Sequence, residues 1–236
     1  ATGIFGKWHL GDAKGFLPLN QGFDEYLGLP YSNDMWPVGY DGQPVKSGGN
    51  KSQHPPLPLI KNDRPIDTIN TLEDQATLTG RLADAAIQFI RKNKHKPFFA
   101  YIPNPMPHVP INASPAFRGK SKQGMYGDVI QEVDYNVGKI MQTLKEEGLD
   151  KNTLVIFTSD NGPWLNFGNH AGSAGGFREG KGTSFEGGQR VPCIMRWKGV
   201  LPAGIVANQL ASTIDILPTI SALTKAPLSE KKIDGV

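Results

Sequence analysis

Three segments of the sequence place ionisable or amide side chains directly after short apolar runs of strand length. Lys7 and His9 lie in the first segment, His108 in the second, and Asp160 and Asn161 in the third. Each segment also has an ordinary structural interpretation, as a surface pair, a rigid proline-flanked loop and a tight turn. In a parallel sheet the carboxyl ends of the strands form the ligand-binding edge, so we expect these segments to contribute to one site.

The carboxylate of Asp160 and the amide of Asn161 are hard oxygen donors, which suit Ca²⁺ or Mg²⁺ better than zinc. Calcium takes about six to eight oxygens, so the remaining ligands must come from elsewhere. The Asp-Asn-Gly turn would predict a hairpin. A long glycine-rich loop follows instead, which weakens the interpretation as a simple turn.

Lys181 lies in the glycine-rich segment 175–182, which nearly matches a phosphate-binding P-loop. The match fails at Gly182, where the motif requires Ser or Thr, and no helix is expected to begin at Lys181. A lysine among glycines can still approach an anion closely, although a solvated loop is an equally good interpretation. Cys193 lies in an apolar strand pattern, and we expect a buried, inert thiol.

Helical periodicity and short apolar runs alternate along the second half of the chain. This pattern predicts an α/β fold with a mainly parallel central sheet flanked by helices, in a single domain over residues 1–236. Residues 10–70 show little periodicity and are expected to form surface loops rather than a packed layer. The expected elements are helices over 71–90, 129–144 and 212–223 and strands over 98–102, 153–158 and 191–197, with the strand 153–158 covered on both faces.

Composition excludes several classes of protein. The 236 residues carry a net charge of +3, too small to indicate nucleic acid or an anionic membrane as partner. A single cysteine excludes an internal disulfide framework and a cysteine-based zinc site. No apolar run reaches the roughly 20 residues of a membrane span, and the first residues lack the features of a signal peptide.

Taken in order, five segments of the chain resemble the formylglycine-dependent sulfatases, in particular arylsulfatase-like enzymes of the alkaline phosphatase superfamily. The segments are Gly-Lys-Trp-His-Leu-Gly at 6–11, Gly-Phe-Asp-Glu-Tyr-Leu-Gly at 22–28, Met-Pro-His-Val-Pro at 106–110, Thr-Ser-Asp-Asn-Gly at 158–162 and Gly-Lys-Gly-Thr-Ser-Phe-Glu-Gly-Gly-Gln-Arg-Val-Pro at 180–192. The resemblance covers essentially the whole chain, so it implies the fold and chemistry of that family.

The resemblance also implies a role for each matching residue. Lys7 and His9 would contact the formylglycine nucleophile, with His9 taking a proton when the aldehyde is regenerated. His108 would protonate the leaving-group oxygen, and Lys181 would bind a sulfate oxygen. His170 lies in the same loop and would contact substrate. Asp160 and Asn161 would supply part of a calcium site, with Mg²⁺ as the alternative cation.

The sequence departs from the family pattern in what it lacks. The nucleophile motif, Cys/Ser-x-Pro/Ala-x-Arg, and two further calcium-binding aspartates would lie before Gly6, and the C-terminal subdomain would follow residue 236. Cys193, in Cys-Ile-Met-Arg, cannot replace the nucleophile. We therefore expect an internal fragment of a sulfatase that shows no turnover by itself.

Other functions and several properties stay open at this point. The alternatives are a phosphodiesterase or phosphonate hydrolase of the same superfamily, a non-catalytic anion-binding protein, and a nucleotide-binding module. The resemblance implies a sulfated small molecule or glycan as substrate and a secreted, periplasmic or lysosomal location. Specificity would lie in loops 12–70 and 163–178. The sequence leaves the oligomeric state undetermined.

Overall fold

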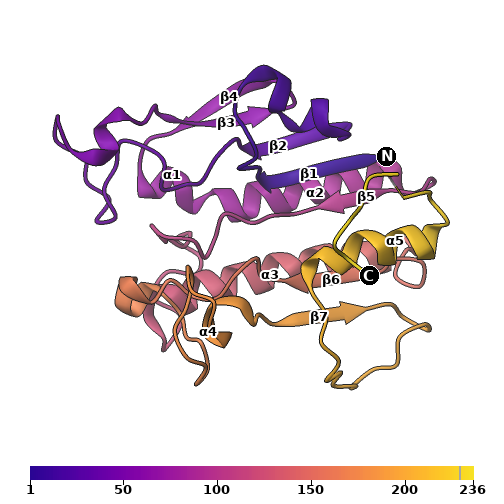
Figure 1. Ribbon diagram of the computed structural model, residues 1–236. Coiled ribbons are helices and arrows are strands. Elements are labelled where there is room, and N and C mark those ends of the chain that lie inside the picture. The colour runs from indigo at the N-terminus through magenta and orange to yellow at the C-terminus, as the bar shows by residue number, and fades with distance from the viewer. Residues whose placement is uncertain (229) are drawn as a thin grey trace.

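The computed structural model describes residues 1–228 and 230–236 and shows two sheets with helices packed around them (Figure 1). The strands are β1 (Thr2–Lys7), β2 (Glu25–Leu29), β3 (Leu57–Lys61), β4 (Arg64–Ile69), β5 (Phe99–Tyr101), β6 (Val155–Thr158) and β7 (Cys193–Arg196). The helices are α1 (Leu72–Ala76), α2 (Leu78–Asn93), α3 (Gly124–Glu146), α4 (Glu186–Gln189) and α5 (Ile216–Thr224). Short 3-10 segments lie at Lys14–Phe16, Pro18–Gln21, Asn50–Gln53, Leu165–His170 and Thr213–Asp215.

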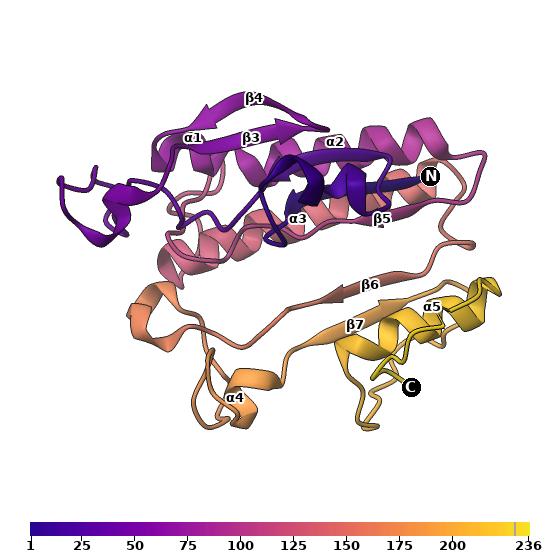
Figure 2. The same cartoon turned by 45° about the horizontal axis from the view of Figure 1, so that its top comes forward.

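The larger sheet is mixed and has the strand order β4-β3-β2-β1-β5. Its central strands β2, β1 and β5 are parallel, whereas β3 and β4 add to the edge in antiparallel fashion. The second sheet is an antiparallel pair, β6 and β7. Figure 2 shows this pair lying apart from the larger sheet, with β6 running in the same direction as β1. The predicted α/β class is confirmed.

Helix α2 covers one face of the larger sheet. Phe5 of β1 packs against Ala86 and Phe89 of the helix, and the rings of Phe5 and Phe89 lie 5.4 Å apart. On the other face, Ile4 and Tyr26 pack against the chain around Leu17. Burial on both faces explains the apolar character of β1, and it holds Lys7, the last residue of this strand, at the carboxyl edge of the sheet.

The predicted helices are confirmed, with one interruption. A break at Thr77 separates α1 from α2, so the periodic stretch that starts at Thr71 forms two helices. The capping box is present, because the amide of Asp74 donates to Oγ1 of Thr71 at 3.1 Å and the amide of Thr71 donates to Asp74 at 3.0 Å. Helix α3 ends before Gly148, which adopts a left-handed conformation with a φ of 71°.

The prediction that residues 10–70 form no packed layer is wrong. This region contributes β2, β3 and β4, and Leu57 and Leu59 of β3 are fully buried against α1 and α2. Pro58 and Pro65 interrupt the alternating pattern that would mark these strands. Their pairing also depends on contacts that local sequence does not reveal.

Two predictions about β6 and β7 are also wrong. Phe157 of β6 is 41% exposed, so this strand is not covered on both faces. Cys193, expected to be buried, is exposed. The reason is that the two strands pair mainly with each other, which leaves much of the pair open to solvent. Within the described residues, no helix is both long enough and apolar enough to cross a membrane.

Candidate active site

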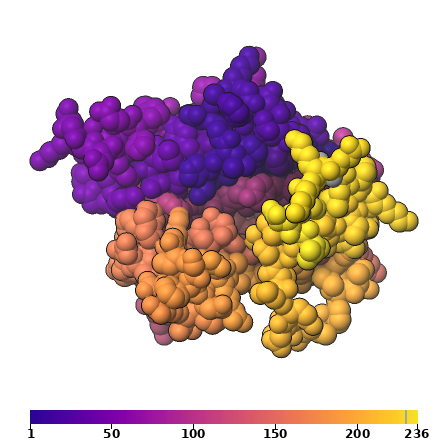
Figure 3. Space-filling model, viewed as in Figure 1, coloured from indigo at the N-terminus to yellow at the C-terminus, as the bar shows by residue number. Residues whose placement is uncertain are grey.

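The polar segments that follow β1, β5 and β6 meet at one edge of the molecule. The strands β1, β5 and β6 all run toward this edge, where the loops around Lys7, His108 and Asp160 begin (Figure 1). Figure 3 shows the surface hollowed between the N-terminal residues in indigo and the segment after residue 150 in orange. The candidate residues of these three segments therefore lie at the carboxyl edge of the sheet.

Lys7 and His9 are fixed by backbone hydrogen bonds to two neighbouring loops. The amide of Lys7 donates to the carbonyl of Pro103 at 2.8 Å, and the amide of His9 donates to Pro30 at 3.0 Å. His9 adopts a left-handed backbone conformation with a φ of 56°, which is uncommon for a residue other than glycine. This conformation turns the chain sharply immediately after the strand.

Burial and nearby charges, among them those of Asp160 and Lys181, act on the ammonium group of Lys7. Burial lowers the pKa of Lys7, the negative charge of Asp160 raises it, and the positive charge of Lys181 lowers it, with a net lowering. Burial and the charge of Lys7 likewise lower the pKa of His9. The structure thus brings together residues from the first, third and glycine-rich segments of the sequence.

His108 is held in one orientation with one ring nitrogen free. Its Nδ1 lies 2.7 Å from the carbonyl oxygen of Val109. A carbonyl can only accept, so Nδ1 carries the proton and Nε2 is left to exchange a proton with a ligand. The side chain of Asn33 donates to the carbonyl of His108 at 3.1 Å and fixes the loop from the other side.

Burial lowers the pKa of His108, and the charge of Lys181 lowers it further. The hydrogen bond to Val109 and the charge of Asp34 raise the pKa, but the net effect is a lowering. An empty site therefore holds mostly neutral imidazole at neutral pH. An anion that binds between His108 and Lys181 opposes the effect of the lysine charge and raises the pKa of the imidazole.

Lys181 reaches the site because two loops approach each other at their backbones. The amide of Lys181 donates to the carbonyl of Pro163 at 2.9 Å, and the amide of Gly162 donates to Gly188 at 2.9 Å. A Cβ atom on Gly162 would lie 1.8 Å from the carbonyl oxygen of Gly187. Glycine is therefore required at position 162 for the two loops to approach each other this closely. The close backbone packing explains why this part of the sequence is rich in glycine.

The near P-loop match does not form a nucleotide-binding loop in this structure. No helix begins at Lys181, as expected, and α4 starts five residues later with a length of 4 residues. The ammonium group of Lys181 lies 5.0 Å from the centre of the Trp164 ring, which itself lies 5.8 Å from the His108 ring. Lys181 and His108 thus flank one aromatic side chain.

Asp160 and Asn161 have the chemistry of metal ligands. Asp160 is exposed, and in the described chain its carboxylate makes no ion pair within 4.0 Å. The side-chain amide of Asn161 donates to Gly162 at 2.9 Å, which leaves its Oδ1 available to a cation. Among the described residues, no group of three or more acidic, histidine or cysteine side chains could hold a metal. Asp160 and Asn161 offer hard oxygen donors of the type that Ca²⁺ and Mg²⁺ prefer, but two donors are only part of the ligand set that such a cation needs.

His170, a predicted site residue, lies at the end of the 3-10 segment Leu165–His170. This segment begins directly after Trp164, whose ring lies 5.8 Å from the ring of His108. The proposed contact of His170 with substrate rests on loop membership alone.

Ser114–Arg118 matches the letters of the nucleophile motif but is packed elsewhere. The amide of Ser114 donates to Glu132 of α3 at 2.9 Å, and the guanidinium of Arg118 donates to Glu73 at 2.7 Å. These contacts tie the segment to helices α3 and α1. The match to the motif therefore does not identify a nucleophile.

Asp34 is a site residue that sequence reasoning missed. Burial raises the pKa of its carboxyl group, but the Ser32 hydroxyl, the charge of His108 and the Tyr40 hydroxyl lower it by more. Tyr40 donates to Asp34 at 3.2 Å. Asp34 lies in the loop that follows β2, at the same edge of the sheet. Because β2 was not predicted, there was no reason to expect a site residue in this loop.

Two lysines, two imidazoles and two hard oxygen donors thus share the carboxyl edge of an α/β fold. Cationic groups concentrated in this way stabilise the negative charge of a tetrahedral oxyanion, and His108 is arranged to transfer a proton next to it. Fold and site together define an α/β protein with a cationic ligand-binding edge suited to a tetrahedral oxyanion.

The chain belongs to the Sulfatase family, whose model matches residues 1–226. It is 39% identical over 243 residues to N-acetylgalactosamine-6-sulfatase of Canis lupus familiaris, covering 99% of this chain and 44% of that protein. The PsFucS1 sulfatase from Pseudoalteromonas sp. has the same fold, with a TM-score of 0.89 at 33% identity, over 100% of this chain and 50% of that one.

A further solved structure, Ps i-CgsB in complex with k-i-k-neocarrahexaose, matches with a TM-score of 0.77 at 31% identity. The match covers 99% of this chain and 53% of that one. The present chain therefore spans about half the length of the relatives it matches.

Proposed function

We propose that the protein containing this chain hydrolyses the sulfate ester of a sugar. The observation that supports the proposal is the convergence of Lys7, His108 and Lys181, whose charges act on one another at the carboxyl edge of the sheet. A sugar is favoured because one relative is named N-acetylgalactosamine-6-sulfatase and one related structure holds k-i-k-neocarrahexaose. A secreted, periplasmic or lysosomal location accompanies this proposal.

His108 is the proposed general acid. The hydrogen bond to Val109 fixes Nδ1 as the protonated nitrogen, so the second proton of the imidazolium is on Nε2, which would donate it to the substrate. Binding of the sulfate anion raises the pKa of His108 and charges the ring when a proton is needed. Transfer of that proton to the bridging oxygen allows a sugar hydroxyl to leave as a neutral alcohol.

Lys181 and Lys7 are proposed to bind the sulfate group. The ammonium of Lys181 approaches a sulfate oxygen as a point charge, next to the ring of Trp164. Lys7 and His9 would contact the nucleophile, and His9 would accept a proton from it. Asp160 and Oδ1 of Asn161 would hold the calcium ion, with Mg²⁺ as the alternative, and a bound cation would withdraw charge from the sulfate.

Leaving-group dependence tests the role of His108. In the full-length protein, His108→Gln is expected to lower kcat about 10²- to 10⁴-fold for a sulfated sugar, whose alkoxide requires protonation. The same substitution should affect a nitrophenyl sulfate far less, because nitrophenolate leaves without a proton. Equal losses with both substrates would contradict the general-acid role.

Substrate comparison separates the remaining alternatives. Faster hydrolysis of nitrophenyl phosphate than of nitrophenyl sulfate would favour the phosphodiesterase or phosphonate hydrolase. The absence of turnover of either ester by the full-length protein would favour the anion-binding protein. The 236-residue polypeptide by itself is expected to bind sulfate without turnover, and release of sulfate by it would contradict this expectation.

A further inference from the structure

A row of aromatic side chains extends from the proposed sulfate site to a second lysine. We call it the aromatic row and define it as Tyr40, Phe167 and Trp164. The ring centres of Tyr40 and Phe167 lie 4.6 Å apart, and those of Phe167 and Trp164 lie 4.7 Å apart. Lys181 lies beside Trp164 at one end, and Lys51 lies 4.0 Å from the centre of the Tyr40 ring at the other.

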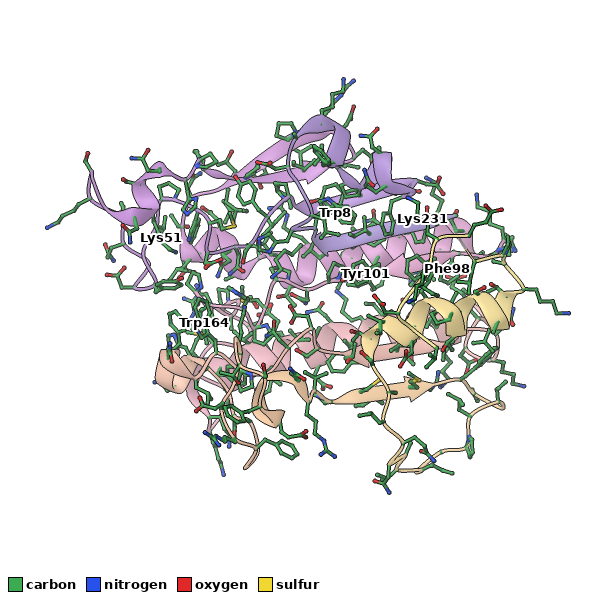
Figure 4. All side chains as sticks on the ribbon, in the orientation of Figure 1. Trp8, Lys51, Phe98, Tyr101, Trp164 and Lys231 are labelled. Atoms are coloured by element: carbon green, nitrogen blue, oxygen red, sulfur yellow. The ribbon has the colours of Figure 1, made fainter. Side chains whose placement is uncertain are left out.

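The aromatic row is built from two loops far apart in the sequence. Tyr40 and Lys51 belong to the loop between β2 and β3, whereas Trp164 and Phe167 follow β6. Figure 4 shows Lys51 and Trp164 at the same end of the molecule, where the carboxyl edge of the sheet lies. Tyr40 is 38% exposed, and Phe167 and Trp164 are half-buried, so the row presents aromatic surface to solvent.

The charge of Lys51 is held at this position without a carboxylate in ion-pair contact. Its ammonium donates to the carbonyl of Val38 at 3.3 Å and lies over the Tyr40 ring. Within the described part of the chain, no acidic oxygen lies within 4.0 Å of it, although the more distant Asp34 acts on its charge. Lysines elsewhere on the surface, such as Lys94 and Lys198, do form such pairs.

These features match the chemistry of a sugar residue that bears an anionic group. Aromatic side chains pack against the apolar face of a sugar ring, and a few polar groups at the margin fix its orientation. The carboxylate of Asp34, 3.2 Å from the Tyr40 hydroxyl, can accept a hydrogen bond from a sugar hydroxyl. Lys51 supplies a positive charge at the far end.

We propose that the aromatic row binds the sugar residue next to the one whose sulfate occupies the Lys181 site, and that Lys51 binds a second sulfate on that neighbouring residue. The inference rests on the proposed function, because Lys181 must hold the first sulfate. It narrows the substrate class to oligosaccharides with sulfates on adjacent residues. Lys51 is thereby assigned a role in substrate selection.

Binding of two matched disaccharides to the chain tests the inference by calorimetry. One disaccharide carries a single sulfate on its terminal residue, and the other carries a second sulfate on the neighbouring residue. The second sulfate is expected to strengthen binding about fivefold, the effect of one partly exposed ion pair. Lys51→Met is expected to abolish this gain, and Tyr40→Leu to weaken both disaccharides but not inorganic sulfate.

Lys46→Met is the matched control, because Lys46 is an exposed lysine of the same loop. It should preserve the full gain from the second sulfate. Equal affinities of the parent chain for the two disaccharides would overturn the inference. So would an equal weakening of both by Lys51→Met, which would show that Lys51 only supports the loop.

Inorganic sulfate distinguishes failure of the inference from failure of the proposed function. If the parent chain binds inorganic sulfate and Lys181→Gln weakens this binding, the sulfate site is supported. If the doubly sulfated disaccharide then binds no more strongly than the singly sulfated one, only the assignment of Lys51 is overturned. If Lys181→Gln leaves sulfate binding unchanged, or the parent chain binds no sulfate, both the sulfate site and the inference fail.

Discussion

Substituting Gly162 by alanine probes the backbone contact that brings Lys181 to the site. The new Cβ would lie 1.8 Å from the carbonyl oxygen of Gly187 and 2.9 Å from its carbonyl carbon. Atoms in van der Waals contact lie about 3.5 Å apart, so the two loops must separate by roughly 1.5 Å or more. Both contacting atoms belong to the backbone, so no side-chain rotation relieves the overlap.

The expected cost of Gly162→Ala follows from the contacts that the separation breaks. Two backbone hydrogen bonds join the loops here, Gly162 to Gly188 and Lys181 to Pro163, each at 2.9 Å. Losing a hydrogen bond costs about 0.5–1.5 kcal/mol, and overpacking costs about 1–3 kcal/mol. We expect the free energy of unfolding to fall by roughly 2–4 kcal/mol, and the affinity for sulfate to fall because Lys181 moves.

Urea unfolding followed by circular dichroism measures the stability change, and calorimetry measures sulfate affinity. Gly138→Ala is the control, because this glycine lies within α3 and a Cβ there would meet no atom within 4 Å. The control should gain about 0.5–1 kcal/mol from improved helix propensity. If Gly162→Ala unfolds within about 0.5 kcal/mol of the parent and keeps its sulfate affinity, the backbone contact does not hold the site together.

Two further predictions concern charge. Lys181→Gln is expected to raise the pKa of His108, because the lysine charge lowers it in the parent. NMR titration of the His108 ring protons measures this pKa. An unchanged value would contradict the proximity of the two groups. Asp128 accepts backbone hydrogen bonds from residues 119, 120 and 121, which lower its pKa although burial raises it. Asp128→Asn should cost about 1–3 kcal/mol at pH 7. A lowered pKa stabilises the fold only while the carboxylate is charged. The loss of stability of the variant relative to the parent should therefore persist down to about pH 4 and become smaller below it. Urea unfolding midpoints that differ by a constant amount at all pH values would refute this reasoning.

The local parts of the fold could be predicted from the sequence because they depend on neighbouring residues. The capping box at Thr71 and the apolar face that includes Val129 predicted two helical regions that the structure contains. The strand that ends before Asp160 was predicted from an apolar run. Its partner and its exposure were not predictable, because pairing between β6 and β7 spans a loop of irregular structure.

Candidate site residues could be found from the sequence only where the strand before them could be recognised. Lys7 ends one short apolar run, and His108 and Asp160 come after two others. The structure brings these three segments to one edge. Asp34 and Tyr40 follow β2, whose Glu-Tyr-Leu-Gly-Leu sequence is not a continuous apolar run, because Glu25 and Gly28 interrupt it. Recognition of β2 would have directed attention to the loop that also carries Lys51.

The incomplete pairing of the strands has a consequence for the behaviour of the chain in solution. Among the described strands, β5 pairs with β1 alone and β6 with β7 alone, so β5, β6 and β7 each carry a free edge. Apolar side chains beside these edges are exposed, including Phe99 at 46% and Ile194 at 64%. Free edges with apolar neighbours are templates for intermolecular strand pairing. Self-association of the isolated polypeptide at high concentration would therefore begin at β5 and at the β6–β7 pair, rather than at the closely packed loops around Lys181.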